Sequence, residues 1–292
     1  MYKAIAANKR NTIMIMALFV GIIGGIGWVV SAFYGDTSIA YFVIIVAGMY
    51  ALLQYFIATK LSIAMTGAKQ IEKRDNPRFY RIVENLSITT GLPMPKVYII
   101  EDVAPNAFAT GRDPQHALVA ATTGLIEIMD DSELEAVMAH EMAHVQNYDI
   151  RVGMITFGLV SAIGLLTDIV LRMFIFGDRD NNDSSSPIAM IVGLIVIILA
   201  PIVAVIVQMA VSRQREFLAD ATSAMTTRNP DSMISALGKL RKYGRPMKRQ
   251  NSSVAHLFIS NPLKPGIVGK LFSTHPLIED RVDRLRNNEG KF

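Results

Sequence analysis

The sequence contains no cysteine, which excludes disulfide bonds and thiolate metal ligands. Charged residues are also scarce: they make up 18% of the 292 residues, a low share for a soluble domain, whereas 51% are hydrophobic. Histidine occurs only five times. Any zinc or iron site must therefore be built from His, Asp and Glu, with few histidines to choose from. The net charge of +4 is modest, and the basic residues cluster beside apolar runs, so we expect no nucleic-acid partner.

Four long apolar runs predict membrane helices. Three of them carry no charge and are long enough to cross a bilayer: residues 12–32, 38–59 and 184–212. A cleaved signal peptide is the alternative for the first run, but a second run follows almost at once. The remaining run, residues 152–176, is third along the chain and is interrupted by Asp168 and Arg172, which can pair on one helix face. We expect it to span, with an interfacial or re-entrant position as the alternative.

Lysine and arginine predict the orientation of these helices. Basic residues precede the first run and follow the second, whereas the link at residues 33–37 has none. The positive-inside rule then places both termini and residues 60–151 in the cytoplasm. The expected division is an N-terminal transmembrane hairpin, the first part of a cytoplasmic domain, a second hairpin and the second part of that domain: residues 1–59, 60–151, 152–212 and 213–292.

The polar parts of the chain predict short helices and a few strands. Helices are expected at residues 77–90, 131–147, 213–226, 230–240, 254–259 and 276–287. Strands are expected at residues 96–100, 106–110 and 117–122. Ser132 and Glu135 fit a capping box at the start of the helix that follows Asp130.

The most informative stretch is His140-Glu-Met-Ala-His144, an H-E-x-x-H motif. On a helix the two histidines lie one turn apart on the same face, so both imidazoles can bind one metal ion. Glu141 projects beside them, where its carboxylate can take a proton from an attacking water. Average His and Glu usage gives this pattern by chance in roughly one chain of this length in a hundred. Whether the motif is a metal site must therefore be judged from the rest of the sequence.

A catalytic zinc usually takes three protein ligands and one water, so a third ligand is needed. The candidate is Glu216, which lies four residues before Asp220 on the same face of a predicted helix. One carboxylate can bind the metal while the other accepts a hydrogen bond from a ligand imidazole. The alternative is a solvated acidic face that pairs with Arg213 or Arg215.

The H-E-x-x-H motif is followed, after two apolar runs, by R-E-F-L-A-D at residues 215–220. This order resembles the HtpX family of membrane-bound zinc metalloproteases, heat-shock proteases related to the CAAX prenyl proteases. Two further stretches match the family, P-N-A-F-A-T-G at residues 105–111 and T-H-P at residues 274–276. The resemblance covers nearly the whole chain. One departure is Leu277, where the family often has a second proline, and we expect no effect on chemistry.

The resemblance implies a role for each matched residue. Zinc, one ion per subunit, would be bound by His140, His144 and Glu216. Glu141 would be the catalytic base, and Asp220 would orient a ligand imidazole. The negative oxygen of the tetrahedral intermediate would be stabilised by His275 and Arg281; without the resemblance these read as a loop histidine and a solvated helix residue. The edge strand at residues 106–110 would bind the substrate through Asn106, Ala107 and Phe108, with an ordinary structural strand as the alternative.

The expected fold is mainly α with a small β-sheet: a polytopic membrane protein with four transmembrane helices and a zincin-like (gluzincin) cytoplasmic protease domain. The implied function is that of a zinc endopeptidase of the bacterial cytoplasmic membrane, which cleaves misfolded or damaged membrane proteins at the cytoplasmic face. Its partners would be membrane-protein substrates and the lipid bilayer. The alternatives are an intramembrane metalloprotease, a prenyl-protein protease and a non-catalytic metal-binding scaffold. Retention of Glu141 argues against the scaffold, which has no need of a base.

Overall fold

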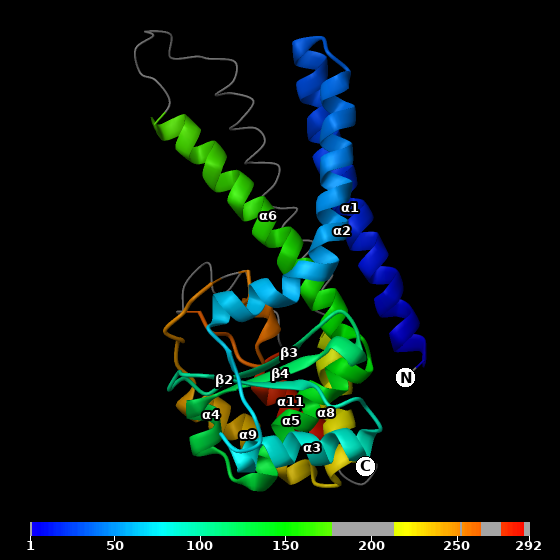
Figure 1. The fold of residues 1–292 in the computed structure, drawn as a ribbon. Coiled ribbons are helices and arrows are strands. Elements are labelled where there is room, and N and C mark those ends of the chain that lie inside the picture. Colours follow the sequence, from blue (N-terminus) through cyan, green and yellow to red (C-terminus); the bar gives the residue numbers. More distant parts are fainter. Residues whose placement is uncertain (1, 177–212, 252, 264–275, 289–292) are drawn as a thin grey trace.

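The computed structural model describes residues 2–176, 213–251, 253–263 and 276–288. Three long helices rise from a rounded part that contains the sheet and the other helices (Figure 1): α1 (Tyr2–Tyr34), α2 (Ser38–Thr66) and α6 (Asp149–Phe176). The helices α1 and α2 pack side by side as a hairpin, whereas α6 diverges from them. The N-terminus lies beside the rounded part, so α1 leads away from it and α2 returns.

Two helices of the described chain are long and apolar enough to span a membrane, by length and composition: Ile5–Trp28 and Ser38–Thr66. Only 28% and 22% of the residues in their apolar windows are buried, unlike the core helix of a soluble domain. The predicted third span forms the continuous helix α6. The predicted fourth span, residues 184–212, lies outside the described residues.

The sheet has four strands in the order β1-β2-β4-β3: β1 (Lys69–Gln70), β2 (Lys96–Ile100), β4 (Leu118–Thr122) and β3 (Ala107–Thr110). The central pair, β2 and β4, is parallel, and the two outer pairings are antiparallel. Every residue of β3 and β4 is buried, because helices or loops cover both faces. The short strand β1 was not predicted, since two residues are too few to show an alternation.

Alternate residues of the strands enter two different cores. Val97, Val119 and Ala109 pack with the helices below the sheet. Phe108 and Leu118 point the other way and join a core that continues into α1, α2 and α6. The sheet therefore connects the rounded part to the long helices.

The other helices are α3 (Pro77–Thr90), α4 (Thr123–Ile128), α5 (Asp131–Gln146), α8 (Arg213–Thr227), α9 (Pro230–Tyr243) and α11 (Ile278–Arg286), with 3-10 turns at Pro114–His116 and Ala255–Leu257. All of the predicted helices in the polar parts are present, the stretch 254–259 only as the second 3-10 turn. The helix α4 was not predicted.

The capping box of α5 differs from the prediction. Asp130, not Ser132, is the N-cap: its side chain accepts from the main-chain N of Glu133, whose own side chain accepts from the main-chain N of Asp130. Ser132 instead donates to the Asp130 carboxylate at 2.7 Å. The cap therefore lies two residues before the predicted position, and Glu133 takes the place assigned to Glu135.

Candidate metal centre

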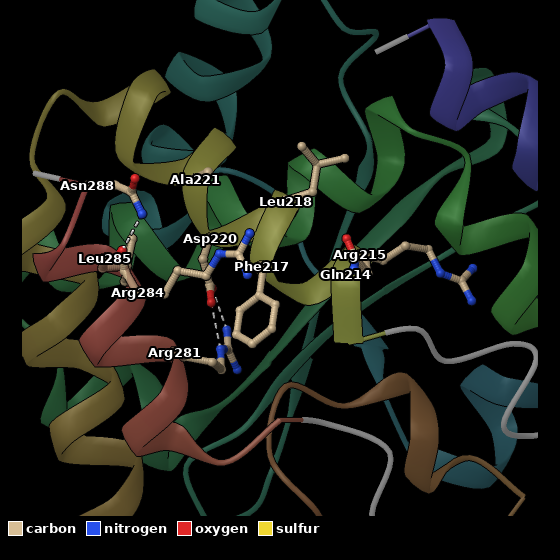
Figure 2. Close-up of a pocket in the computed structure, with 10 residues that line it drawn as sticks. All are labelled: Gln214, Arg215, Phe217, Leu218, Asp220, Ala221, Arg281, Arg284, Leu285 and Asn288. Atoms are coloured by element: carbon tan, nitrogen blue, oxygen red, sulfur yellow. Dashed lines mark hydrogen bonds and ion pairs between the residues drawn. The ribbon is translucent and has the colours of Figure 1, made fainter. Parts of the chain in front are cut away.

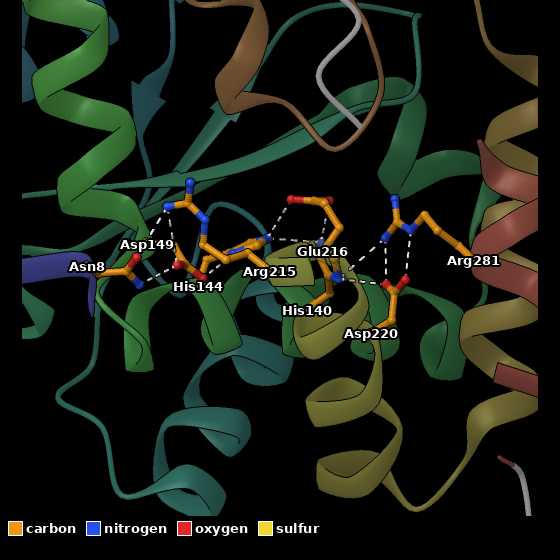
Figure 3. Close-up of polar contacts among 8 residues, drawn as sticks. All are labelled: Asn8, His140, His144, Asp149, Arg215, Glu216, Asp220 and Arg281. Atoms are coloured by element: carbon orange, nitrogen blue, oxygen red, sulfur yellow. Dashed lines mark hydrogen bonds and ion pairs between the residues drawn. The ribbon is translucent and has the colours of Figure 1, made fainter. Parts of the chain in front are cut away.

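The helix α5 brings its two histidines together in the interior of the protein. His140 is 1% exposed, and its Nε2 lies 3.2 Å from Nε2 of His144 (Figure 3). The two rings are perpendicular, with centroids 4.7 Å apart. Because both Nε2 atoms point to the same spot, the helix presents two nitrogen ligands to one ion, as predicted from their spacing.

Glu216 is brought to the same spot by α8. Its Oε1 lies 3.6 Å from Nε2 of His144, and its Oε2 lies 3.8 Å from Nε2 of His140. The two helices are joined by a hydrogen bond from Ser223 Oγ to the main-chain O of Ala136, 2.6 Å long. The predicted third ligand is therefore adjacent to the two histidines, and the alternative of a solvated acidic face is excluded for Glu216, which is 4% exposed.

These three side chains fit a zinc ion. Zinc–ligand bonds of 2.0–2.2 Å in a tetrahedron place the ligand atoms about 3.4 Å from one another. The two Nε2 atoms are 3.2 Å apart, His144 Nε2 lies 3.6 Å from Glu216 Oε1, and His140 Nε2 lies 3.8 Å from Glu216 Oε2. Two imidazoles and one carboxylate leave the fourth position open, as in catalytic rather than structural zinc sites.

Asp220 holds the far side of the His140 ring. Its Oδ1 lies 2.9 Å from Nδ1 of His140, which leaves Nε2 for the metal. Arg281 of α11 binds the same carboxylate with two hydrogen bonds, from Nε at 2.8 Å and from Nη2 at 2.6 Å. Burial raises the pKa of Asp220, but the Arg281 charge and hydrogen bonds outweigh burial and bring that pKa to about 2. The carboxylate is therefore ionised at neutral pH.

Asp149 holds Nδ1 of the His144 ring, as Asp220 holds Nδ1 of His140. Its Oδ2 lies 2.9 Å from Nδ1 of His144, and its Oδ1 accepts from Asn8 Nδ2 at 2.6 Å. Arg215 approaches the same carboxylate at 3.8 Å. Sequence reasoning missed Asp149 and Asn8. The only signal for Asp149 was an acidic residue five positions after the motif, and Asn8 gave none.

The two histidines have opposite electrostatic surroundings. Burial lowers the pKa of His140 to about 4, despite the hydrogen bond to Asp220. Burial also lowers the pKa of His144, but the hydrogen bond to Asp149 and the Glu216 charge outweigh it and raise that pKa to about 9. His140 is therefore a neutral ligand at pH 7, whereas a proton competes with a metal for His144.

Glu141 lies beside the three ligands and is 2% exposed. Its negative charge contributes to the raised pKa of His144 and to that of Arg281. The structure thus places a buried carboxylate within electrostatic range of His144 and Arg281. Its role as catalytic base remains a prediction.

The other predicted site residues lie in three different settings. Arg281 is buried behind His140, and its nitrogens face Asp220 and His140 Nδ1. His275 lies outside the described residues. Ala107 and Phe108 are buried in β3, and Asn106 is buried directly before it. The outer edge of the strand here is occupied by the chain itself: Ile259 N donates to Ala107 O at 2.9 Å, and Phe258 pairs with Phe108.

A cavity of about 470 Å³ lies between α8 and α11, and Asp220 and Arg281 are among the residues that line it (Figure 2). It is lined by apolar and basic side chains, among them Phe217, Leu218, Arg284 and Leu285. The guanidinium of Arg284 stacks on the Phe217 ring at 4.5 Å. The cavity thus adjoins the residues that hold His140.

Two histidines one turn apart, a glutamate from a second helix and a buried carboxylate beside them define a metalloendopeptidase site. Comparison with known proteins agrees: residues 73–289 match the model of peptidase family M48. The chain belongs to this family, and His140, His144 and Glu216 are its zinc-binding triad.

The chain is also similar to curated relatives over its full length. It is 56% identical over 292 residues to the protease HtpX homolog of Tropheryma whipplei (strain Twist), covering 100% of both chains. It is 43% identical over 295 residues to the protease HtpX homolog of Streptococcus gordonii, covering 98% of this chain and 99% of the relative. The family resemblance found in the sequence is thereby confirmed.

Among solved structures, the crystal structure of S. mikatae Ste24p has a similar fold. The TM-score is 0.50 and the sequence identity is 18%, with 93% of this chain and 61% of that chain covered. The chain thus spans about three fifths of the length of that protein. At this identity the likeness concerns the fold alone.

Proposed function

We propose that this zinc metalloendopeptidase acts at the cytoplasmic face of a bacterial membrane and cleaves misfolded or damaged membrane proteins. The observation that carries the proposal is the position of the metal centre at the foot of the long helices α1 and α6. His144 lies near the end of α5, just before α6 begins at Asp149. Asn8 of α1 contacts Asp149, which holds His144. A substrate segment that emerges from the bilayer would therefore meet the active site directly.

The exposed surface of α2 supports a membrane location. Large apolar side chains point outward along most of its length, several of them more than half exposed: Tyr41, Phe42, Ile45, Met49, Leu52, Leu53 and Phe56. Such a continuous apolar surface is costly in water and favourable in lipid. Near the N-terminus, Lys9 and Arg10 are exposed, and Lys9 Nζ lies 5.1 Å from the centre of the Tyr148 ring between α5 and α6. This favours a cytoplasmic position for the rounded part.

The metal centre also bears on the second pair of spans. Nε2 of His144 and Oε1 of Glu216 are 3.6 Å apart, so both lie on one side of the membrane. The chain between them, which includes α6, must then cross an even number of times. This supports the proposal that residues 152–176 and 184–212 cross as a pair, giving four spans in all.

In the proposed mechanism, zinc when bound supplies a Lewis acid that lowers the pKa of water and polarises the scissile carbonyl. Glu141 accepts the proton of the attacking water and passes it to the leaving amine nitrogen. Asp220 and Asp149 keep Nδ1 of the two histidines protonated, so that each Nε2 lone pair faces the ion. His275 and Arg281 remain the proposed stabilisers of the tetrahedral oxyanion.

A substrate strand would pair with the outer edge of β3. Asn106 O accepts from Thr122 of β4, whereas Ala107 O points outward to Ile259. Because the backbone groups of an antiparallel strand alternate between its two neighbours, those of Ala109 also point outward. Pairing at Ala107 and Phe108, as predicted, would require displacement of residues 258–260. Ala109 lies beyond that stretch, and we propose that the substrate pairs there.

The experiment is a cleavage assay with the purified full-length chain in detergent. The substrates are an unfolded membrane protein and, for comparison, an unfolded soluble protein. We expect zinc-dependent cleavage that favours the membrane protein and is abolished by Glu141→Gln, with zinc still bound. Glu135→Gln, on the same helix but away from the ligands, is the matched control and should cleave normally. Cleavage that persists in purified Glu141→Gln would refute the assignment of the base.

The intramembrane alternative is disfavoured by the start of α5. Asp130 caps that helix, and Asp131 and Glu133 lie in its first turn. The helix packs beneath the sheet, so its motif does not lie within an apolar span. Equal cleavage of the soluble and the membrane substrate would refute the proposed preference for membrane proteins, but not the metalloendopeptidase activity.

A further inference from the structure

Asn8 reaches the metal centre from the first apolar helix. It lies on α1, remote in sequence from the protease motifs, and is 3% exposed. Its Nδ2 donates to Asp149 Oδ1 at 2.6 Å and to the main-chain O of Asn147 at 2.8 Å. Its Oδ1 accepts from Arg215 Nη1 at 3.3 Å. All of the hydrogen-bonding groups of this side chain thus face the region between α5, α6 and α8 (Figure 3).

The carboxylate of Asp149 is held at both oxygens. Oδ2 faces Nδ1 of His144 at 2.9 Å, and Oδ1 accepts from Asn8 at 2.6 Å. Without Asn8, the described partner left for Oδ1 is Arg215 at 3.8 Å, which is too long for a hydrogen bond. The carboxylate could then rotate, and the His144 ring would lose its fixed orientation.

The backbone between the two helices gives an independent reason for a clamp at this place. Tyr148 has a φ of 63°, in the left-handed region that costs a residue with a side chain about 1–2 kcal/mol. Asn8 binds the carbonyl of Asn147 before this turn and the side chain of Asp149 after it. It therefore bridges the turn that places Asp149 against His144.

We propose that Asn8 is a positioning residue of the metal centre. It fixes Asp149 and, through Asp149, the His144 ring, so that zinc affinity depends on the docking of the N-terminal end of α1. The inference rests on zinc being the metal of the proposed function. It makes a residue of the first apolar helix part of the metalloprotease site.

The test measures zinc dissociation constants of the full-length chain in detergent, by competition with a chromophoric chelator. Asn8→Leu keeps the size of the side chain but removes its hydrogen bonds, and we expect the Kd to rise about tenfold, the low end of the effect of residues that hold metal ligands. Asn8→Asp should weaken binding further, since it sets two carboxylates against each other. Asn11→Leu, one turn along the same helix, is the matched control and should leave the Kd unchanged.

A double variant separates positioning from general damage to the fold. In Asn8→Asp with Asp149→Asn, the new amide at position 149 can accept from His144 and donate to the new carboxylate at position 8, which still faces Arg215. We expect the double variant to bind zinc more tightly than either single variant. The absorption spectrum of the cobalt-substituted protein should likewise shift in the single variants and return towards the original in the double variant.

Either of two results with the single variants would overturn the inference: an unchanged Kd in Asn8→Leu, or an equal rise in Asn11→Leu. Additive losses in the double variant would also refute it, because they would show that the two side chains do not act through each other. These outcomes differ from failure of the proposed function, in which the unmodified chain itself would bind no zinc or cleave no protein.

Discussion

Oδ1 of Asp220 lies 2.9 Å from Nδ1 of His140, although α6 and residues 177–212 separate the two along the chain. The contact joins α5 to α8 and fixes which imidazole nitrogen faces the metal. It also continues to Arg281, which binds the same carboxylate through two nitrogens. The ligand His140 is thus held by a buried network contributed by three helices.

Removal of the Asp220 carboxylate should therefore weaken the metal site. We expect Asp220→Ala to raise the zinc Kd about 10–100-fold, the usual effect of losing a residue that orients a metal-bound histidine. Competition with a chelator measures this effect directly. Asp231→Ala, which removes an exposed carboxylate from α9, is the control. A Kd within twofold of the unmodified chain would show that Asp220 does not orient His140.

Arg281 offers a choice between two roles. If it acts through Asp220, Arg281→Met should lower stability by about 3–5 kcal/mol, because a buried carboxylate loses its partner, and should also weaken zinc binding. If it acts only on the oxyanion, kcat should fall while the zinc Kd and the unfolding temperature stay the same. We expect loss of stability and affinity whether or not Arg281 also acts on the oxyanion, since it is 1% exposed and binds Asp220. Arg286→Met, on the exposed side of α11, should change neither.

Ionisation of the Glu133 carboxyl should make the stability of the protein depend on pH. Burial raises the pKa of this carboxyl, but hydrogen bonds from Lys239, Ser235 and the main-chain N of Asp130 outweigh burial and lower it below its ordinary value of 4.5. The folded chain therefore holds the ionised form, and its stabilising effect is complete above about pH 4.5 and lost as the pH falls through the lowered value.

The corresponding variant is Glu133→Gln. At pH 7 we expect it to lower the free energy of unfolding by about 1–2 kcal/mol, from the loss of charged hydrogen bonds to a partly exposed lysine. The difference from the unmodified chain should shrink below pH 4.5, as followed by thermal unfolding in detergent. Glu135→Gln should show no such pH-dependent difference. A difference that grew on acidification would mean that the folded chain raises, rather than lowers, the pKa of Glu133.

Asn106 holds the loop at residues 258–260 against β3. Its Nδ2 donates to Ser260 O at 2.8 Å, and its Oδ1 accepts from Ser260 N at 3.1 Å. We expect Asn106→Ala to lower the free energy of unfolding by about 1–3 kcal/mol, because two main-chain groups of Ser260 lose their partner. Asn85→Ala, at an exposed position of α3, is the control. A raised KM with unchanged unfolding would instead indicate direct substrate binding by Asn106.

Local sequence signals predicted the parts of the fold that depend on neighbouring residues. Pro77 at the first helical position and Gly91 after the last one fixed α3 at both ends. The β-branched run at residues 96–100 gave β2 with the correct bounds. Spacing of four residues predicted the pairs on α5 and α8, because positions one turn apart share a face in any helix.

What could not be predicted depends on tertiary packing. Asp149 contacts His144 only because Tyr148 adopts a left-handed conformation and turns the chain. Asn8 contacts Asp149 only because α1 packs against α6. The predicted basic-acidic helix near the C-terminus is present as α11, but Arg281 is its buried arginine rather than a solvated residue. A sequence period alone does not show which arginine of such a short helix points inward.

The separation of the ligands along the chain sets an order on their appearance during synthesis. His140 and His144 leave the ribosome before residues 152–212, and Glu216 leaves after them. Asp220 follows Glu216, and Arg281 comes near the end. A growing chain therefore lacks a complete zinc site until residues 152–212 have been made, so it cannot cut nearby proteins, itself included, before Glu216 has been added.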